Sequence, residues 1–296
     1  MSESRSVDRA QLDTHRVRAA FDRASAGYDQ AAALQARVRD ELTERLALFK
    51  LSPRVALDLG TGTGGGAQAL ARAYRRASVL ALDNSAGMLR EARRRSGFFR
   101  RFTRILADAG ALPLVGASVD LVFSNLMLQW CNDLAGPLAE VRRVLTPGGL
   151  FTFSTFGPDT LKELRAAWAR VDDDSHVNRF LDMHDVGDAL TRAGFAEPVL
   201  DVERVVLTYP DTTALMRDLK AIGAHNATSA RPRGLTGRTR MENMRAAYEP
   251  FRRAARLPAS FEIIYACAWG EGAQRTLATV SAGEARIPVD SIRRRI

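Results

Sequence analysis

Short apolar runs alternate with helical segments between residues 54 and 155, and no other feature of the sequence limits the fold as strongly. Each run is short and almost uniformly apolar, which is typical of a parallel strand covered on both faces. Strands that alternate with helices indicate an α/β fold with a doubly wound parallel sheet. The expected strands are 54–60, 78–83, 103–108, 119–125 and 150–155, with helices at 66–75, 86–95 and 134–145.

Helical patterns flank these strands on both sides. Apolar residues recur at helical spacing in 17–24 and 32–49. A Pro-Gly-Gly turn at 147–149 leads into the fifth strand. Later segments predict strands at 199–209 and 261–269, helices at 160–171, 183–193, 212–222 and 241–256, and a loop at 224–240.

The expected sheet is therefore seven-stranded and mostly parallel. We expect the chain to divide into an N-terminal helical lid at 1–50, a ligand-binding core at 51–157, a completion of the sheet at 158–270 with helical insertions at about 158–182 and 210–256, and a charged tail at 271–296.

The chain is strongly basic, with a formal net charge of +9. Of its 43 basic residues only Lys50, Lys162 and Lys220 are lysines, a skew more typical of biased base composition than of a binding code. The net field still favours acidic partners: a nucleic acid, an anionic membrane surface or an acidic carrier protein. An ordinary solvated surface is the alternative.

Other features narrow the class of protein. No stretch approaches the ~20 apolar residues that a membrane span needs. The polar segment 1–14 lacks the apolar region of a secretory signal, so we expect a cytoplasmic protein without membrane association. Cys131 and Cys267 lack metal-ligand spacing, so we expect buried thiols and no metal site.

The first strand ends in the turn Gly60-Thr61-Gly62-Thr63-Gly64. Glycines between a strand and a helix let the backbone approach a ligand closely. Alone, such a turn fits a dinucleotide, another nucleotide or no ligand. Its spacing, with Asp58 just before it, resembles motif I of class I methyltransferases, which have a Rossmann-like fold. An acid beside the turn disfavours a pyrophosphate and suits the ammonium group of S-adenosylmethionine.

Two further acids end the next strands. Asp83 ends the second strand and can accept hydrogen bonds from both ribose hydroxyls. In methyltransferases an acid at the position of Asp108 takes the adenine amino group, and the next N–H, of Ala109, meets the ring. Leu82 and Met88 are positioned to sandwich the adenine, or else belong to the core. The predicted cofactor-binding residues are Asp58, Gly60, Gly62, Gly64, Asp83, Met88, Asp108, Ala109 and Asn125.

The fourth strand ends in Ser124-Asn125-Leu126-Met127-Leu128-Gln129-Trp130, which faces the transferred methyl group in this fold. We expect Asn125, Gln129 and Trp130 to contact substrate. Amine methyltransferases that act on nucleic-acid bases have Asn-Pro-Pro-Tyr or Asp-Pro-Pro-Tyr here, and cytosine-C5 enzymes need Pro-Cys. Neither pattern is present, so a nucleic-acid substrate is disfavoured despite the charge.

Segments outside the core are similar to the malonyl-acyl carrier protein O-methyltransferase family. They are Phe21-Asp-Arg-Ala-Ser-Ala-Gly-Tyr28-Asp29, the residues 153–165, His176-Val-Asn-Arg179-Phe180-Leu, Leu219-Lys-Ala-Ile-Gly223-Ala and Tyr265-Ala-Cys-Ala-Trp269-Gly. The resemblance implies methylation of the free carboxylate of a malonyl thioester on acyl carrier protein for biotin (pimeloyl) synthesis. Malonyl-coenzyme A is a possible second acceptor.

A malonyl carboxyl group, with a pKa of about 4, is ionised at neutral pH, so direct in-line transfer needs no general base. A cationic or hydroxyl anchor must hold the carboxylate. We expect Tyr28 and Arg179 to provide it, with His176 near the substrate. Exposed arginines that are candidates for the acidic carrier are Arg217, Arg231, Arg233 and Arg238.

Three alternatives stay open at this point. The first is a related small-acid O-methyltransferase with the same lid. The second is a protein-modifying relative of the mitochondrial complex I assembly-factor arginine hydroxylase, which the segment Ala26-Gly-Tyr28-Asp29 disfavours. The third is a non-catalytic binding module of the same fold.

Overall fold

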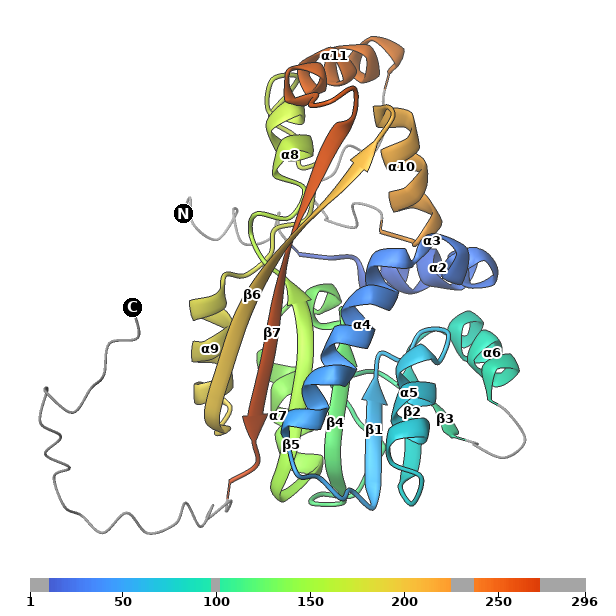
Figure 1. Ribbon diagram of the computed structural model, residues 1–296, viewed down its shortest axis with the longest axis vertical. Helices are drawn as coiled ribbons and strands as arrows, with labels where there is room; N and C mark the ends of the chain where they lie inside the picture. Colours follow the sequence, from blue (N-terminus) through green and yellow to red (C-terminus); the bar gives the residue numbers. More distant parts are fainter. Residues whose placement is uncertain (1–10, 97–101, 225–236, 272–296) are drawn as a thin grey trace, which may run out of the picture.

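The computed structural model describes residues 11–96, 102–224 and 237–271. Its centre is one seven-stranded sheet with the order β3-β2-β1-β4-β5-β7-β6 (Figure 1). All neighbouring strands pair in parallel except β7, which is antiparallel to both β5 and β6. The strands are β1 Val55–Leu59, β2 Ser78–Asp83, β3 Thr103–Leu106, β4 Val119–Asn125, β5 Leu145–Phe156, β6 Ala196–Tyr209 and β7 Leu257–Trp269.

The predicted doubly wound, mostly parallel seven-stranded sheet is confirmed. The strand order reverses direction between β1 and β4, and ligands of such sheets bind outside the carboxyl ends of the strands at that point. The helices are α2 Thr14–Ala24, α3 Tyr28–Ala31, α4 Ala33–Arg45, α5 Gly65–Ala73, α6 Ala86–Arg95, α7 Ala135–Val144, α8 Lys162–Trp168, α9 Met183–Arg192, α10 Thr212–Ala221 and α11 Arg238–Tyr248.

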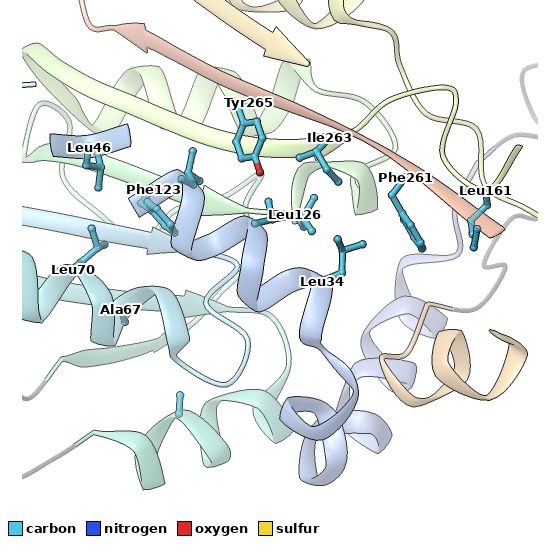
Figure 2. Packing of buried hydrophobic residues seen from close by; sticks show 14 of the residues in the cluster. Leu34, Leu46, Ala67, Leu70, Phe123, Leu126, Leu161, Phe261, Ile263 and Tyr265 are labelled. Carbon is cyan, nitrogen blue, oxygen red and sulfur yellow. The ribbon is translucent and has the colours of Figure 1, made fainter. Parts of the chain in front are cut away.

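Helices cover both faces of the sheet, because neighbouring side chains of a strand point to opposite sides. On one face Leu34 of α4 and Leu70 of α5 pack against Phe123 of β4 and Tyr265 of β7 (Figure 2). On the other face α7 and α9 pack through residues such as Val141 and Leu190 against Val122, Phe151 and Ile264. The apolar packing on the two faces of the sheet holds in place the strand ends that carry the glycine turn and the acids.

Helices also gather beyond the carboxyl ends of the parallel strands. β6 and β7 extend beyond the other strands of the sheet, and α8, α10 and α11 lie at that end of the molecule, with α10 next to α2 and α3 (Figure 1). Buried Tyr248 of α11 donates a 2.8 Å hydrogen bond from its hydroxyl to the Pro258 carbonyl, which ties α11 to β7. Helices α8, α10 and α11, with the segment 169–182 after α8, therefore cover the sheet edge where a ligand is expected, and we call them the roof.

Two expectations about element bounds are wrong. The helix expected at 241–256 begins at Arg238 and ends at Tyr248, followed by the 3₁₀ turn Glu249–Phe251. Pro250 lacks an N–H for a continuing helix, and Ala254 and Ala255 have positive φ.

The Pro-Gly-Gly segment at 147–149 lies inside β5, not before it. Val119 pairs with Leu145, whereas Leu121 pairs with Leu150, so the extra residues form a bulge with Gly148 at φ 74°. Within the described ranges, no helix is long and apolar enough to cross a membrane. The expected charged tail from 272 onward and the candidates Arg231 and Arg233 lie outside those ranges.

Candidate active site

The glycine turn is held against the end of β2. The N–H groups of Gly60 and Thr61 both donate to the Leu82 carbonyl at 2.9 Å. Gly60 has φ 76°, and a Cβ there would lie 2.2 Å from Cγ of Met127. A Cβ on Gly62, with φ 53°, would meet nothing within 4 Å. The turn therefore requires glycine for its backbone and leaves open space above Gly62.

Asp58 lies below this turn and does not line the cavity above it. Its buried carboxylate accepts a 2.6 Å hydrogen bond from the Thr61 hydroxyl and lies against Gly66 at the start of α5. Burial raises the pKa of Asp58 to about 7, while the Thr61 hydroxyl and the Ala67 N–H act in the opposite direction. Asp58 thus braces the turn through Thr61, and its direct contact with an ammonium group stays a prediction.

Asp83 does line the cavity. Its carboxylate accepts 2.8 Å hydrogen bonds from the N–H groups of Gly62 and Ser85. Burial raises the pKa of Asp83 to about 6, against the effect of those two donors. Each oxygen retains a lone pair, so the carboxylate can still accept from a ligand hydroxyl.

Asp108 lies two residues beyond β3, on the rim of the cavity. Its exposed carboxylate accepts from the Gly110 N–H at 2.8 Å. This bond orients the acid and shapes the chain around Ala109, which also lines the cavity.

The cavity has a volume of about 510 Å³ and joins the sheet edge to the lid and the roof helices. Of the predicted site residues, Asp58, Gly64 and Arg179 do not line it. Those that do are Tyr28, Gly60, Gly62, Asp83, Met88, Asp108, Ala109, Asn125, Gln129, Trp130 and His176, together with Leu82.

Asn125 and Gln129 make hydrogen bonds within the protein. Asn125 donates to the Gln35 carbonyl of α4 at 3.0 Å and accepts from the Ser154 hydroxyl at 2.9 Å. Gln129 donates to the Leu126 carbonyl at 2.7 Å. These two side chains join the lid, β4 and β5 at the base of the cavity.

Two hydrogen-bonded contacts hold the lid over the glycine turn. Asp22 of α2 accepts from the Ser85 hydroxyl and the Gly87 N–H, both at 2.7 Å. Asp29 of α3 accepts from the Thr63 hydroxyl at 2.6 Å and pairs with Arg95. The lid is therefore bonded to the segments that would enclose a nucleotide.

Aromatic side chains close the cavity near the lid. Phe21 meets Trp130 edge-to-face, with ring centroids 5.2 Å apart. Burial raises the pKa of Tyr28 far above its ordinary value, and the carboxylates of Asp83 and Asp29 add to the effect. The Tyr28 phenol is therefore a neutral hydrogen-bond donor at physiological pH.

His176 lines the cavity, but its ring already has partners. It stacks on Trp168 at 3.6 Å between centroids, and its Nε2 lies 2.8 Å from Oδ1 of Asp172. Arg240 of α11 donates to Asp172 and to Asp174. Because a guanidinium already neutralises this acidic group, the cluster joins two roof segments and does not suggest a metal site.

Arg179 is exposed, and the expectation that it anchors a carboxylate in the cavity is not supported. Its neighbours Asn178 and Phe180 face the cavity, so Arg179 between them faces solvent. The roof also contributes Lys220, which the sequence interpretation did not select. Two features of the sequence could have pointed to Lys220: it lies in the segment 219–224, which resembles the family, and it is one of only three lysines.

Cys131 also lines the cavity. Burial raises the pKa of its thiol to about 12, and the nearby Asp108 carboxylate adds to the effect. A protonated thiol is a poor nucleophile, so the structure favours direct transfer over a covalent Cys131 intermediate.

Known proteins resemble the chain over most of its length. A relative from Methylovorus sp. named malonyl-[acyl-carrier protein] O-methyltransferase is 53% identical over 87% of this chain and 89% of its own. One of the same name from Halorhodospira halophila is 47% identical over 97% and 98%. The chain belongs to the malonyl-[acyl-carrier protein] O-methyltransferase family. The predicted resemblance is thereby confirmed.

More distant similarities agree with this membership. A family model described as a methyltransferase domain matches residues 57–153, from β1 into β5. A putative methyltransferase from Bacillus halodurans has the same fold, with a TM-score of 0.59 at 18% identity over 78% of this chain and 99% of its own. Proteins with much lower sequence identity to this chain thus share its fold.

Proposed function

We propose that this enzyme transfers a methyl group from S-adenosylmethionine to the free carboxylate of a malonyl thioester on acyl carrier protein. The observation that carries the proposal is the single cavity that joins the glycine turn, Asp83 and Asp108 to the lid residue Tyr28. Membership of a family whose curated relatives bear that name supports the same acceptor.

The residues at the sheet edge fit the cofactor S-adenosylmethionine, which supplies a methyl group on a positively charged sulfur. The open space above Gly62 lets the backbone approach its amino-acid part. Asp83 keeps acceptor capacity for ribose hydroxyls, and Asp108 and Ala109, which line the same cavity, would contact the adenine. Met88 and Leu82 are buried apolar walls for the base.

The chain's own residues need only bind, orient and exclude water. The acceptor carboxylate is ionised at neutral pH, so its oxygen needs no general base. The neutral Tyr28 hydroxyl would donate to one carboxylate oxygen and leave the other free to attack in line. Phe21 and Trp130 would shield the reacting atoms from water, which favours a reaction between an anion and a cation.

A methyl ester removes the negative charge that would otherwise mark the end of the acyl chain. Ordinary chain elongation can then treat the product as an uncharged acyl group, which is the role we propose toward pimeloyl and biotin synthesis. The net charge of +9 suits an acidic carrier as partner, with Arg217 and Arg238 as exposed candidates for its docking.

One assay tests the proposal directly. The protein is incubated with S-adenosylmethionine and malonyl-acyl carrier protein, and we expect a mass gain of about 14 daltons on the carrier, as a methyl group in place of a proton requires. Methylation of another small acid, with no gain on the carrier, would contradict it. A parallel reaction with malonyl-coenzyme A shows whether the enzyme requires the carrier protein or only the malonyl thioester.

The Tyr28→Phe variant tests the proposed donor. We expect turnover to fall about 10- to 100-fold, the usual effect of losing a hydrogen bond to a charged group, while cofactor affinity measured by calorimetry stays unchanged. Tyr74→Phe is the matched control, because Tyr74 lies at the end of α5 and does not line the cavity. Wild-type turnover by Tyr28→Phe would exclude the donor role.

A further inference from the structure

We infer that Lys220 of α10 binds the acceptor's carboxylate, in a polar subsite that Asn178 completes. The inference rests on the proposed function and assigns its substrate recognition to the roof. Both residues line the cavity, and both come from segments outside the parallel part of the sheet. Lys220 selects the charged acid over uncharged thioesters, and Tyr28 orients the acid for transfer.

Lys220 is the only lysine or arginine among the described residues that line the cavity. No hydrogen bond or ion pair to another described residue engages its ammonium group, whereas Lys162 pairs with Asp159 at 3.3 Å. Lys220 occupies the last turn of α10, where a positive charge is favourable at a helix end. A lysine that is exposed on the wall of a largely apolar cavity, and that has no partner among the described residues, is suited to an anionic ligand.

The position of α10 brings Lys220 toward the lid. α10 contacts α3, and a Cβ on Gly223, just after α10, would lie 3.4 Å from Phe21. Figure 1 shows α10 beside α2 and α3. The Lys220 end of α10 is therefore on the lid side of the cavity, the side that also holds Tyr28.

Asn178 provides an independent sign of a polar ligand. Its side chain lines the cavity at 8% exposure, and its buried Oδ1 has no hydrogen-bond partner among the described residues. An unsatisfied buried amide oxygen costs free energy that a ligand can recover. The amide can accept through Oδ1 or, after a half turn, donate through Nδ2 to a carboxylate or a thioester carbonyl.

Other nearby cations are bonded within the protein or face solvent, and Nε of Arg165 is buried without a hydrogen-bond partner among the described residues. Arg165 donates to the carbonyls of Pro158 and Thr160, both at 2.9 Å. His176 is held by Asp172, and Arg179 faces solvent. Methylation makes the carboxylate an uncharged ester, so its attraction to Lys220 ends and product release is favoured.

The experiment compares Lys220→Met and Lys220→Arg with the wild type. The acceptor is the malonyl thioester of N-acetylcysteamine, which avoids carrier contacts. We expect Lys220→Met to raise KM about three- to fivefold, as the loss of one exposed charge pair implies, with kcat nearly unchanged and Lys220→Arg near wild type. Calorimetry with S-adenosylhomocysteine present should show the same loss for the malonyl thioester and none for its acetyl analogue.

Arg170→Met is the matched control, because Arg170 is exposed, carries the same charge and does not line the cavity. A wild-type KM in Lys220→Met, or equal weakening of the acetyl analogue, overturns the inference and leaves the proposed function intact. Asn178→Ala should also raise KM for the malonyl thioester. No methylation of any malonyl thioester by the wild type would instead refute the proposed function.

Discussion

At the scale of single residues, Asp83 both lines the cavity and has a pKa that burial has shifted. Burial raises its pKa to about 6, and the N–H groups of Ser85 and Gly62 keep the value from rising further. A carboxylate can accept from ribose hydroxyls, whereas a protonated acid loses part of that capacity. The charge state of this one group should therefore control cofactor affinity near neutral pH.

We expect the dissociation constant of S-adenosylmethionine to be flat above about pH 7 and to increase about tenfold for each pH unit below about 6, the limit for one linked proton. In Asp83→Asn the dependence should disappear, with affinity about 10- to 100-fold weaker at pH 8 because a charged acceptor is lost. Calorimetric titrations from pH 5 to 8 measure both effects. An unchanged pH profile in Asp83→Asn would exclude Asp83 as the titrating group.

Acid unfolding caused by protonation of Asp83 does not explain such a loss of cofactor affinity. The folded-state pKa of Asp83 lies above the ordinary carboxyl value, so the folded protein binds the proton more tightly than the unfolded chain. Protonation of Asp83 between pH 6 and 5 thus favours the folded cofactor-free protein. Asp58, with a pKa of about 7, acts in the same direction.

At the scale of elements, hydrogen bonds of two aspartates join the lid to the cofactor site. Asp22 bonds α2 to the start of α6, and Asp29 bonds α3 to the glycine turn. Both partners lie in segments that would surround the cofactor. Order in the lid and occupancy of the cofactor site should therefore be coupled.

Asp22→Ala removes two of these hydrogen bonds and should release α2 from α6. At about 1 kcal/mol for each bond, local opening should become about 10- to 100-fold more frequent. Hydrogen exchange of the amides in 14–31 measures that opening, and Asp40→Ala, an exposed acid on α4, is the control. Equal exchange in the two variants would show that Asp22 does not hold the lid.

At the scale of the whole molecule, the net charge of +9 acts over distances beyond any single contact. This field attracts an acidic carrier protein, whereas a small malonyl thioester interacts mainly with the groups inside the cavity. Salt screens exposed charges within a Debye length of about 10 Å at ~0.1 M. Ionic strength therefore separates carrier attraction from substrate recognition.

We expect KM for malonyl-acyl carrier protein to increase several-fold between about 0.05 and 0.5 M salt. For the N-acetylcysteamine thioester the change should be clearly smaller, because only Lys220 and its neighbours contribute. Steady-state kinetics with both acceptors measures the difference. Identical salt dependence would show that surface charge does not recruit the carrier.

The sequence by itself determined the sheet, the glycine turn and the acids at the strand ends. These features depend on neighbours in the chain: apolar runs, a glycine with positive φ, and an acid just after a strand. Asp83, Asp108 and Tyr28 accordingly lie on the cavity that the sequence predicted at this edge. Differences such as the bulge at Gly148 and the early end of α11 reflect tertiary pairing and a proline.

Only the tertiary structure decided which way individual side chains face. Asp58 braces the turn from below, and Arg179 faces solvent while its neighbour Asn178 faces the cavity. Helix α10, which carries Lys220, contacts the lid helix α3 because β6 and β7 carry α10 over the sheet edge, and these helices are about 190 residues apart in the chain. No local pattern encodes such an approach, so the acceptor's subsite emerges only once the roof is folded.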